Sequence, residues 1–255
     1  MSLEIVTIPC LADNYAFLLH DQASKETAVI DAPDAAPIRA TLDSRGWTLS
    51  HILLTHHHWD HIDGADELRS AYGAKICGAA ADAHRLPQLD CALTEGDFVT
   101  VGGEKGTIMD VPGHTIGHIA FYFPGSRAVF TADSLMVLGC GRLFEGTPRQ
   151  MWASLCKLAA LPPETRVYSG HEYTEANARF ALTIEPDNAA LLKRYETIQD
   201  MRRSGQPTIP STLAEELATN PFLRSSEPQV KAAVGMDGAP DVEVFAEIRR
   251  RKDNF

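Results

Sequence analysis

Short apolar runs separated by polar turn formers mark the first part of the chain. Strands are predicted over residues 3–8, 15–19 and 27–31, each bounded by proline, aspartate, asparagine or glutamine. Residues 34–45 instead repeat their apolar positions at helical spacing, and the pattern ends before Gly46, a residue typical of helix ends. The chain is therefore predicted to open with an antiparallel meander followed by a helix.

The middle of the chain alternates predicted strands with single helices. Strands are predicted over residues 51–55, 75–77, 97–101, 107–111, 119–123, 128–131 and 166–169, and helices over 66–71 and 150–160. The glycine-rich residues 102–106 are predicted to form a hairpin turn. Strand pairs with helices between them favour two sheets packed face to face and covered by helices, an αββα sandwich of the α+β class.

The pattern changes after Tyr173. From there on the chain is helical by periodicity, over residues 174–181, 189–203, 213–217, 228–234 and 241–252, with breaks at prolines and glycines. We expect two domains, a sandwich over residues 1–173 and a small helical domain over residues 174–255.

Composition narrows the class of protein. The chain has 255 residues, of which 44% are hydrophobic and 22% charged, as in a globular protein with a substantial core. No apolar run approaches the roughly 20 residues that span a bilayer, and the N-terminus has no signal pattern. The five cysteines form no Cys-x-x-Cys pair, so neither disulfides nor a thiolate zinc site is indicated. We expect a cytoplasmic monomer without a membrane partner.

The net charge of -11 argues against a nucleic acid as partner, because such binding depends on clustered lysine and arginine. One local exception is the basic stretch at residues 249–252.

The strongest chemical signal is the stretch Thr-His-His-His-Trp-Asp-His at residues 55–61, between a predicted strand and a predicted helix. A histidine-rich run can also be a tag or a solvated loop. This one is internal, contains aspartate and follows a buried type of strand. His56 and His58 can project to one side of the loop while Asp60 and His61 turn to another, which predicts two adjacent metal ions.

Three further candidates each follow a predicted strand, where a rigid scaffold usually holds functional groups. They are His114, Asp133 and His171. Imidazole and carboxylate ligands without thiolate suit zinc, iron or manganese. His118, close to His114, is expected to support the site or to be structural.

Two metal ions roughly 3.5 to 4 Å apart can activate one water molecule and polarise a carbonyl group, which makes hydrolysis the natural reaction. Outside the ligands no Ser-His or Cys-His nucleophile and no obvious protonating acid stand out. A thiol with a pKa of about 8.5 leaves without such an acid, whereas an amine does not. Thioesters therefore fit this chemistry better than amides.

The motif His-x-His-x-Asp-His at residues 56–61 resembles that of the metallo-β-lactamase superfamily, in which His57 and Trp59 fall on the variable positions and are interpreted as wall and packing residues. Within it, six segments are similar to the hydroxyacylglutathione hydrolase family, glyoxalase II: residues 11–15, 112–118, 139–147, 170–174, 220–224 and 249–253. Together they extend over nearly the whole chain.

This resemblance implies a site with two divalent metal ions, with zinc expected and iron or manganese as alternatives. It assigns His56, His58 and His114 to one ion and Asp60, His61 and His171 to the other, with Asp133 bridging them. Asp60 and Asp133 would act with a hydroxide between the ions.

The implied reaction is hydrolysis of S-D-lactoylglutathione to D-lactate and glutathione, the second step of methylglyoxal detoxification. The implied substrate-binding residues are Arg142, Phe144, Tyr173, Arg249 and Lys252. Some family members carry lysine and tyrosine in place of Arg142 and Phe144. Arg249 and Lys252 would share one face of a terminal helix and bind a carboxylate of glutathione.

Other functions remain open. A glutathione persulfide dioxygenase would use a single iron and leave the second ligand set idle. A lactonase or a β-lactamase would not need the basic residues that fit a carboxylate. A metal-binding protein without catalysis would not need the complete ligand set.

Overall fold

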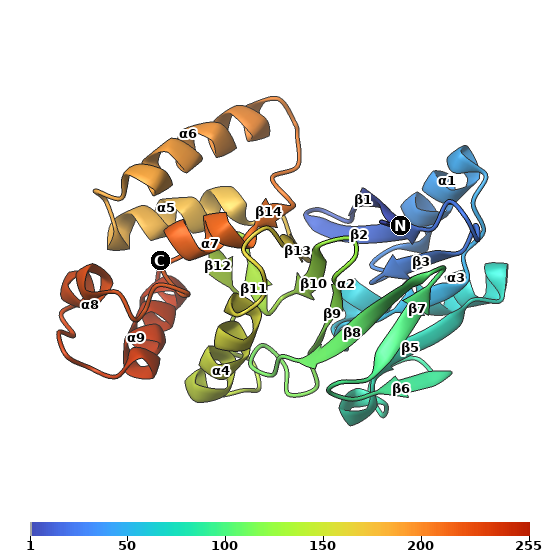
Figure 1. Ribbon diagram of the computed structural model, residues 1–255, viewed down its shortest axis with the longest axis horizontal. Helices are drawn as coiled ribbons and strands as arrows, with labels where there is room; N and C mark the ends of the chain where they lie inside the picture. The colour runs from blue at the N-terminus through green and yellow to red at the C-terminus, as the bar shows by residue number, and fades with distance from the viewer. Residues whose placement is uncertain (1) are drawn as a thin grey trace. The chain divides into compact units, whose positions relative to one another are not determined.

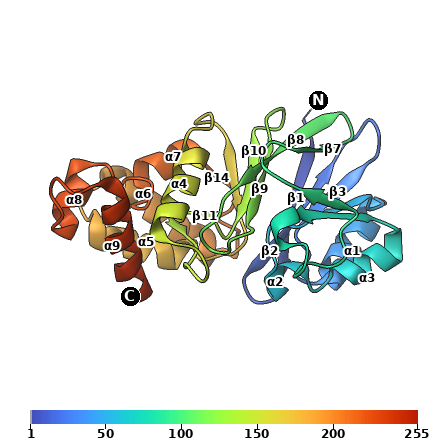
Figure 2. The same ribbon diagram turned by 90° about the horizontal axis from the view of Figure 1, so that it is seen from below.

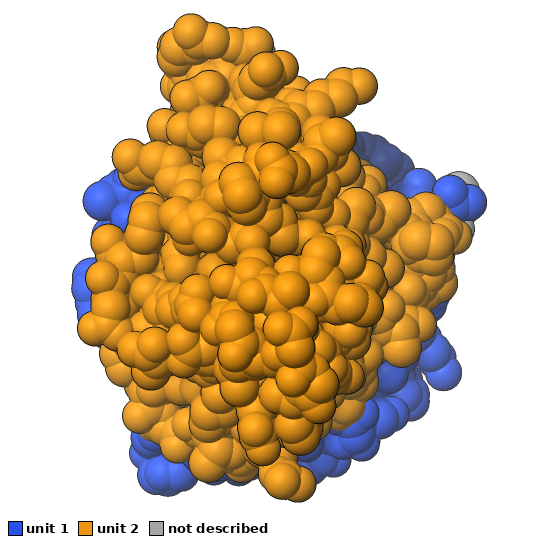
Figure 3. Space-filling model, turned by 90° about the vertical axis from the view of Figure 1, so that its left-hand side faces the viewer, with its two compact units in different colours: residues 1–110, 116–132 blue, residues 111–115, 133–255 orange. Residues whose placement is uncertain are grey.

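The computed structural model describes residues 2–255 (Figure 1). The chain forms two compact units: unit 1 contains residues 1–110 and 116–132, and unit 2 contains residues 111–115 and 133–255 (Figure 3). The domain boundary predicted near Tyr173 falls inside unit 2 and stays a prediction.

The first sheet of unit 1 has six strands in sequence order: β1 (Glu4–Cys10), β2 (Asn14–His20), β3 (Thr27–Ile30), β4 (His51–Leu53), β5 (Lys75–Ala79) and β6 (Cys91–Leu93). The first three strands are antiparallel, which confirms the predicted meander. The last four run parallel, and a parallel pair needs a long crossover that helices supply. The three-residue strand β6 lies outside the sequence prediction.

Two helices, α1 (Ala35–Arg45) and α3 (Ala65–Tyr72), cover one face of this sheet. Asp34 caps the start of α1 by accepting a hydrogen bond from the amide of Ala36, and Gly46 ends it in the left-handed conformation. Ile38, Leu42 and Leu68 of the helices pack in one buried cluster with strand residues. Figures 1 and 2 show α1 and α3 in this part of unit 1.

Unit 1 contributes four antiparallel strands to the second sheet, in the order β10 (Ala128–Ala132), β9 (Ile119–Phe123), β8 (Glu104–Asp110) and β7 (Phe98–Val101). The turn predicted over residues 102–106 is wrong in extent, because Val101 already pairs with Glu104. Gly102 supplies the left-handed φ of 56° that a two-residue turn needs. Glu104 is buried and accepts hydrogen bonds from the amide and hydroxyl of Ser126, which draws it into the strand.

The two sheets of unit 1 meet face to face. Phe17 of β2 contacts Phe130 of β10 with ring centroids 5.6 Å apart. Its neighbour Leu18 points the other way, into the cluster under α1 and α3. All seven residues of β2 are buried, since one face contacts the helices and the other contacts the second sheet. Helix, sheet and sheet layers thus follow the predicted sandwich.

Unit 2 is mainly helical. Its helices are α4 (Pro148–Ala159), α5 (Thr174–Ile184), α6 (Ala189–Arg203), α7 (Leu213–Thr219), α8 (Pro228–Val234) and α9 (Asp241–Asp253), and its strands are β11 (Leu135–Met136), β12 (Gly139–Cys140), β13 (Arg166–Ser169) and β14 (Ser211–Thr212). All predicted helices after Tyr173 are confirmed, with shifts of a few residues at their ends. Trp152 of α4 contacts Phe245 of α9, while α5 and α6 lie side by side (Figures 1 and 2).

The β11–β12 hairpin of unit 2 is held by buried polar side chains of α7 and the residue after it. Glu216 accepts a hydrogen bond from the amide of Leu138 at 2.8 Å, and the Asn220 amide donates to the carbonyl of Gly139 at 3.0 Å. Arg194 of α6 donates to the Glu216 carboxylate, which is fully buried.

Among the residues described, no helix combines the length and the apolar character needed to cross a membrane.

Candidate metal centre

The functional side chains of unit 1 follow the carboxyl ends of three neighbouring parallel strands. Asp31 comes directly after β3, the histidine-rich residues 55–61 follow β4, and Asp82 follows β5. The carboxyl ends of parallel strands lie along one edge of a sheet, where α/β proteins commonly place their sites. The strand order β3-β4-β5 therefore brings these three segments together.

The predicted ligands of unit 1 lie close to one another. His56 and His61 are fully buried, and the centroids of their rings are 4.2 Å apart. The Nε2 atom of His56 is 3.1 Å from the Nδ1 atom of His58. Two nitrogen atoms at this distance suit ligands directed at a shared ion.

The short helix α2 (Trp59–Ile62) begins inside the motif and carries Asp60 and His61, whereas His56 and His58 precede it. Asn14 of β2 donates to both the backbone carbonyl of Asp60, at 2.9 Å, and its carboxylate, at 3.1 Å. This contact gives the family-like segment at residues 11–15 a local role, because Asn14 of β2 holds the predicted ligand Asp60.

Asp31 is a functional residue that the sequence interpretation missed. Its buried carboxylate accepts hydrogen bonds from the amide of Thr55 at 2.8 Å and from the Thr55 hydroxyl at 2.9 Å. It also lies 2.8 Å from Nδ1 of His61, which leaves Nε2 of that ring for a metal ion. The sequence feature that could have identified Asp31 as a site residue is its place directly after the apolar strand at residues 27–30.

Unit 2 gathers the three distant candidates around one carboxylate oxygen. Oδ2 of Asp133 lies 3.5 Å from Nε2 of His114 and 3.3 Å from Nε2 of His171. All three side chains are buried. The carbonyl oxygen of Arg142 lies 2.7 Å from Nδ1 of His114, so that this ring also directs Nε2 inward.

Gly141 makes this arrangement possible. A Cβ atom at residue 141 would lie 1.9 Å from the backbone oxygen of Asp133 and 2.9 Å from Nδ1 of His114. No side chain fits in that space, so glycine allows the chain after β12 to lie against both predicted ligands.

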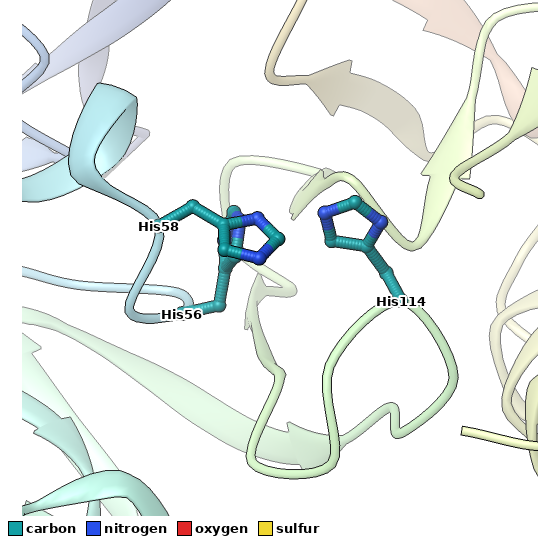
Figure 4. A group of neighbouring side chains, drawn as sticks. All are labelled: His56, His58 and His114. Atoms are coloured by element: carbon teal, nitrogen blue, oxygen red, sulfur yellow. The ribbon is translucent and has the colours of Figure 1, made fainter. Parts of the chain in front are cut away.

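The donor set suits divalent metal ions. Figure 4 draws three of the histidines, His56 and His58 from the loop after β4 and His114 from the loop after β8. His56, His61 and His114 each have Nδ1 next to a protein oxygen atom, which leaves Nε2 as the ligand atom. Imidazole nitrogen and carboxylate oxygen are ligands of zinc and of non-haem iron.

Two predicted substrate-binding residues of unit 2 lie directly on the predicted ligands. The ring of Phe144 contacts that of His114 edge to face, with centroids 5.2 Å apart. The ring of Tyr173 stacks on that of His171 at 4.7 Å. Phe144 is 61% exposed and Tyr173 is 40% exposed, so both aromatic surfaces are open to a ligand.

The three predicted cationic residues also lie in unit 2, with different environments. Arg249 is buried and donates to the carbonyl of Cys140 at 2.8 Å and to the Asp253 carboxylate at 2.8 Å. Arg142 is exposed and lies 3.4 Å from the same Asp253 carboxylate. Arg249 therefore has most of its donors already used by the protein.

Lys252 makes fewer hydrogen bonds to the protein than Arg249 does. It donates to the carbonyl of Ala176 at 3.3 Å and lies over the rings of Phe180 and Phe255. Burial, together with the nearby positive charges of Arg249 and Arg179, lowers the pKa of Lys252 to about 8.

The two residues at the variable positions of the motif, Trp59 and His57, and the nearby His118 have different environments. Trp59 is 63% exposed, so its interpretation as a packing residue is wrong; it begins the helix α2, whose buried residue is His61. His57 is half-buried and lies 3.0 Å from Asp82. His118 stacks on His56 with centroids 4.6 Å apart, in line with the expected supporting position.

Two family models cover the chain almost completely. Residues 14–171 match the model of the metallo-beta-lactamase superfamily. Residues 172–255 match the model described as hydroxyacylglutathione hydrolase C-terminus.

Known proteins are similar to the chain over all or most of its length. A hydroxyacylglutathione hydrolase of Cereibacter sphaeroides is 64% identical over 255 residues, which is 100% of both chains. Among solved structures, the BLEG-1 B3 metallo-beta-lactamase covers 86% of this chain and 99% of its own, with a TM-score of 0.67 and 23% identity. The protein TTHA1623, crystallised in a di-iron-bound form, is 27% identical, with a TM-score of 0.60 and coverage of 86% of this chain and 100% of its own.

Proposed function

Since this chain belongs to the hydroxyacylglutathione hydrolase family of the metallo-β-lactamase superfamily, we propose that it hydrolyses thioesters of glutathione with 2-hydroxy acids, S-D-lactoylglutathione first among them. The products are D-lactate and glutathione. A cytoplasmic location and a monomeric state are part of this proposal.

Seven side chains form the proposed site for two divalent metal ions. His56, His58 and His114 would hold one ion, Asp60, His61 and His171 would hold the other, and the carboxylate of Asp133 would serve both. The inward Nε2 atoms of His61 and His114 support this assignment. We propose zinc as the metal, with iron as the alternative that the di-iron form of TTHA1623 suggests for its own site.

Two divalent ions supply a Lewis acid for the thioester carbonyl and a nucleophilic water at neutral pH. The protein's part is to hold the ligands and to orient the acyl group. Asp31 holds Thr55 and His61, and the carbonyl of Arg142 holds His114, so these ligands are oriented before substrate arrives.

The exposed rings of Phe144 and Tyr173 carry the substrate proposal. Each lies against one predicted ligand, His114 or His171, so a molecule packed on these rings has its reacting group beside the metal centre. Arg142 and Lys252 supply positive charge in the same unit, which suits the carboxylates of glutathione. Arg249 is proposed to bind substrate while also holding α9 against Cys140.

The test is a hydrolysis assay of the purified protein together with metal analysis. We expect S-D-lactoylglutathione to be cleaved, about two metal ions per chain, and loss of turnover after treatment with a strong chelator. A lactone, a β-lactam and glutathione persulfide with oxygen should turn over far more slowly. Preference for one of these three substrates, or a metal-loaded protein inactive on all four, would refute the proposal.

A further inference from the structure

His57 lies between two predicted ligands without being one. Its Nδ1 atom is 3.0 Å from Oδ2 of Asp82, and the side chain of His57 is 16% exposed. This contact joins the loop after β4 to the turn after β5, two neighbouring parallel strands. Because His57 is bonded directly to His56 and His58, fixing its ring limits the backbone freedom of both.

Asp82 is itself held firmly. Its side chain is only 2% exposed, and its Oδ1 atom accepts hydrogen bonds from Nη2 of Arg85 at 2.5 Å and from Nε at 3.2 Å. Its backbone carbonyl accepts hydrogen bonds from the amides of Arg85 and Leu86. One carboxylate oxygen thus serves the guanidinium group, and the other serves the imidazole.

The same carboxylate touches the backbone of a second loop of unit 1. A Cβ atom at Gly117 would lie 2.2 Å from Cγ of Asp82, so the chain at residue 117 runs directly against the carboxylate. The next residue, His118, stacks on His56 with an angle of 12° between the rings. Asp82 therefore has one connection to His56 through His57 and another through Gly117 and His118.

We propose that Asp82 is a positioning residue for the metal centre, which orders the His56 and His58 ligands through its hydrogen bond to His57. This inference rests on the proposed function, because it concerns the same metal site. The hydrogen bond pre-orders the ligand loop before an ion binds, so that less backbone order has to be gained at binding.

The test measures zinc binding to the metal-free full-length chain by competition with a coloured chelator. His57→Leu removes the donor, and Asp82→Asn leaves one oxygen that cannot serve both His57 and Arg85. Both variants should bind zinc about tenfold more weakly, the scale known for groups that orient metal ligands. His57→Asn places an amide donor near the position of Nδ1 and should restore most of the affinity.

Two further variants separate positioning from general damage. His84→Leu makes the same change at an exposed histidine two residues after Asp82 and should bind zinc like the unaltered chain. Gly117→Ala displaces the Asp82 carboxylate without changing the chemical identity of Asp82 or His57, and it should also weaken zinc binding. Circular dichroism of each metal-free variant shows whether it has folded.

The outcomes distinguish the two proposals. If the unaltered chain binds no zinc, the metal-centre proposal fails. If it binds zinc and His57→Leu and Asp82→Asn bind equally well, the positioning role is refuted. It is also refuted if His57→Asn loses as much affinity as His57→Leu, since the ring would then matter and the hydrogen bond would not. Should His57→Leu fail to fold, Asp82→Asn and Gly117→Ala decide the question by the same measurement.

Discussion

Lys252 gives the proposed substrate site a pH dependence that can be measured. Its pKa is lowered from 10.5 to about 8, first by burial and then by the charges of Arg249 and Arg179. If the ammonium group binds a carboxylate of glutathione, binding is strongest below pH 7 and weakens as the pH rises through about 8. The replacement Lys252→Met keeps most of the aliphatic stem and removes the titrating group.

The size of the effect follows from the fraction of charged lysine. With a pKa of about 8, about nine-tenths of the side chain is charged at pH 7 and about one-tenth at pH 9. KM for S-D-lactoylglutathione should therefore rise about tenfold between these pH values. At pH 7, Lys252→Met should raise KM tenfold or more, because a hydrogen bond to a charged group contributes about 1.5 to 3 kcal/mol.

The same lowering of the Lys252 pKa affects the stability of the fold in the opposite direction: substrate binding weakens as the pH rises, but stability increases. Lys252 is protonated in the unfolded chain up to about pH 10.5 but loses its proton near pH 8 in the folded chain. The unfolded chain thus binds more protons between these values, and this group increases the stability of the fold as the pH rises through that window. A higher KM at pH 9 is therefore not explained by loss of structure at Lys252.

Steady-state kinetics from pH 6.5 to 9.5 provide the test, with a small thioester lacking glutathione as the control substrate. In the unaltered chain, KM should rise with pH while deprotonation of Lys252 leaves kcat unchanged. This pattern is expected when an interaction that is equally strong in the bound substrate and in the transition state is lost. Lys252→Met should show a high KM without this rise, and Arg179→Met should move the rise to higher pH. An unchanged profile in Lys252→Met, or an equal effect on the small thioester, would refute the reasoning.

Three further predictions concern other parts of the chain. Asp133→Ala should lose turnover and at least one metal ion per chain by elemental analysis, because the carboxylate is proposed to serve both ions; retention of both would contradict the bridging role. Alkylation should modify the exposed Cys156 and leave activity intact, since Cys140 is buried and its pKa is raised to about 11; inactivation that tracks Cys140 in peptide mapping would contradict this. Glu216→Leu should lower the free energy of unfolding by about 3 kcal/mol or more in urea, because Arg194 loses its buried partner; a change below about 1 kcal/mol would contradict it.

Segments with a clear apolar pattern were predictable from the sequence, down to the four-residue strand β13 (Arg166–Ser169), and the two-residue strands were not. The helix at Ala189–Arg203 and the strand at Ile119–Phe123 have the predicted bounds, since the helix repeats its apolar positions and the strand is apolar throughout. The two-residue strands β11, β12 and β14 carry no period at all. Helix α2 was missed because its four residues, one helical turn, are too few to show a helical period.

The candidate ligands were visible because each is a chemically distinctive residue at a strand end. Their supporting contacts were not, because they join segments far apart in sequence. Asp31 and His61 are 30 residues apart, and Arg142 and His114 are 28 apart. The burial of Arg249 was hidden for the same reason, since its partner Cys140 lies 109 residues away and a basic terminal stretch otherwise indicates an exposed helix.

The partner of His114 is the main-chain carbonyl of Arg142, and this has a consequence for how the family can diverge. Any residue at position 142 supplies the same carbonyl, so the side chain is free to change without altering the orientation of His114. Gly141, in contrast, has no permitted replacement, because its space is filled by Asp133 and His114. If Arg142 contacts the substrate as proposed, substrate preference can change through its side chain while the orientation of His114 is kept, which makes residue 142 a suitable position for redesign toward other thiol groups.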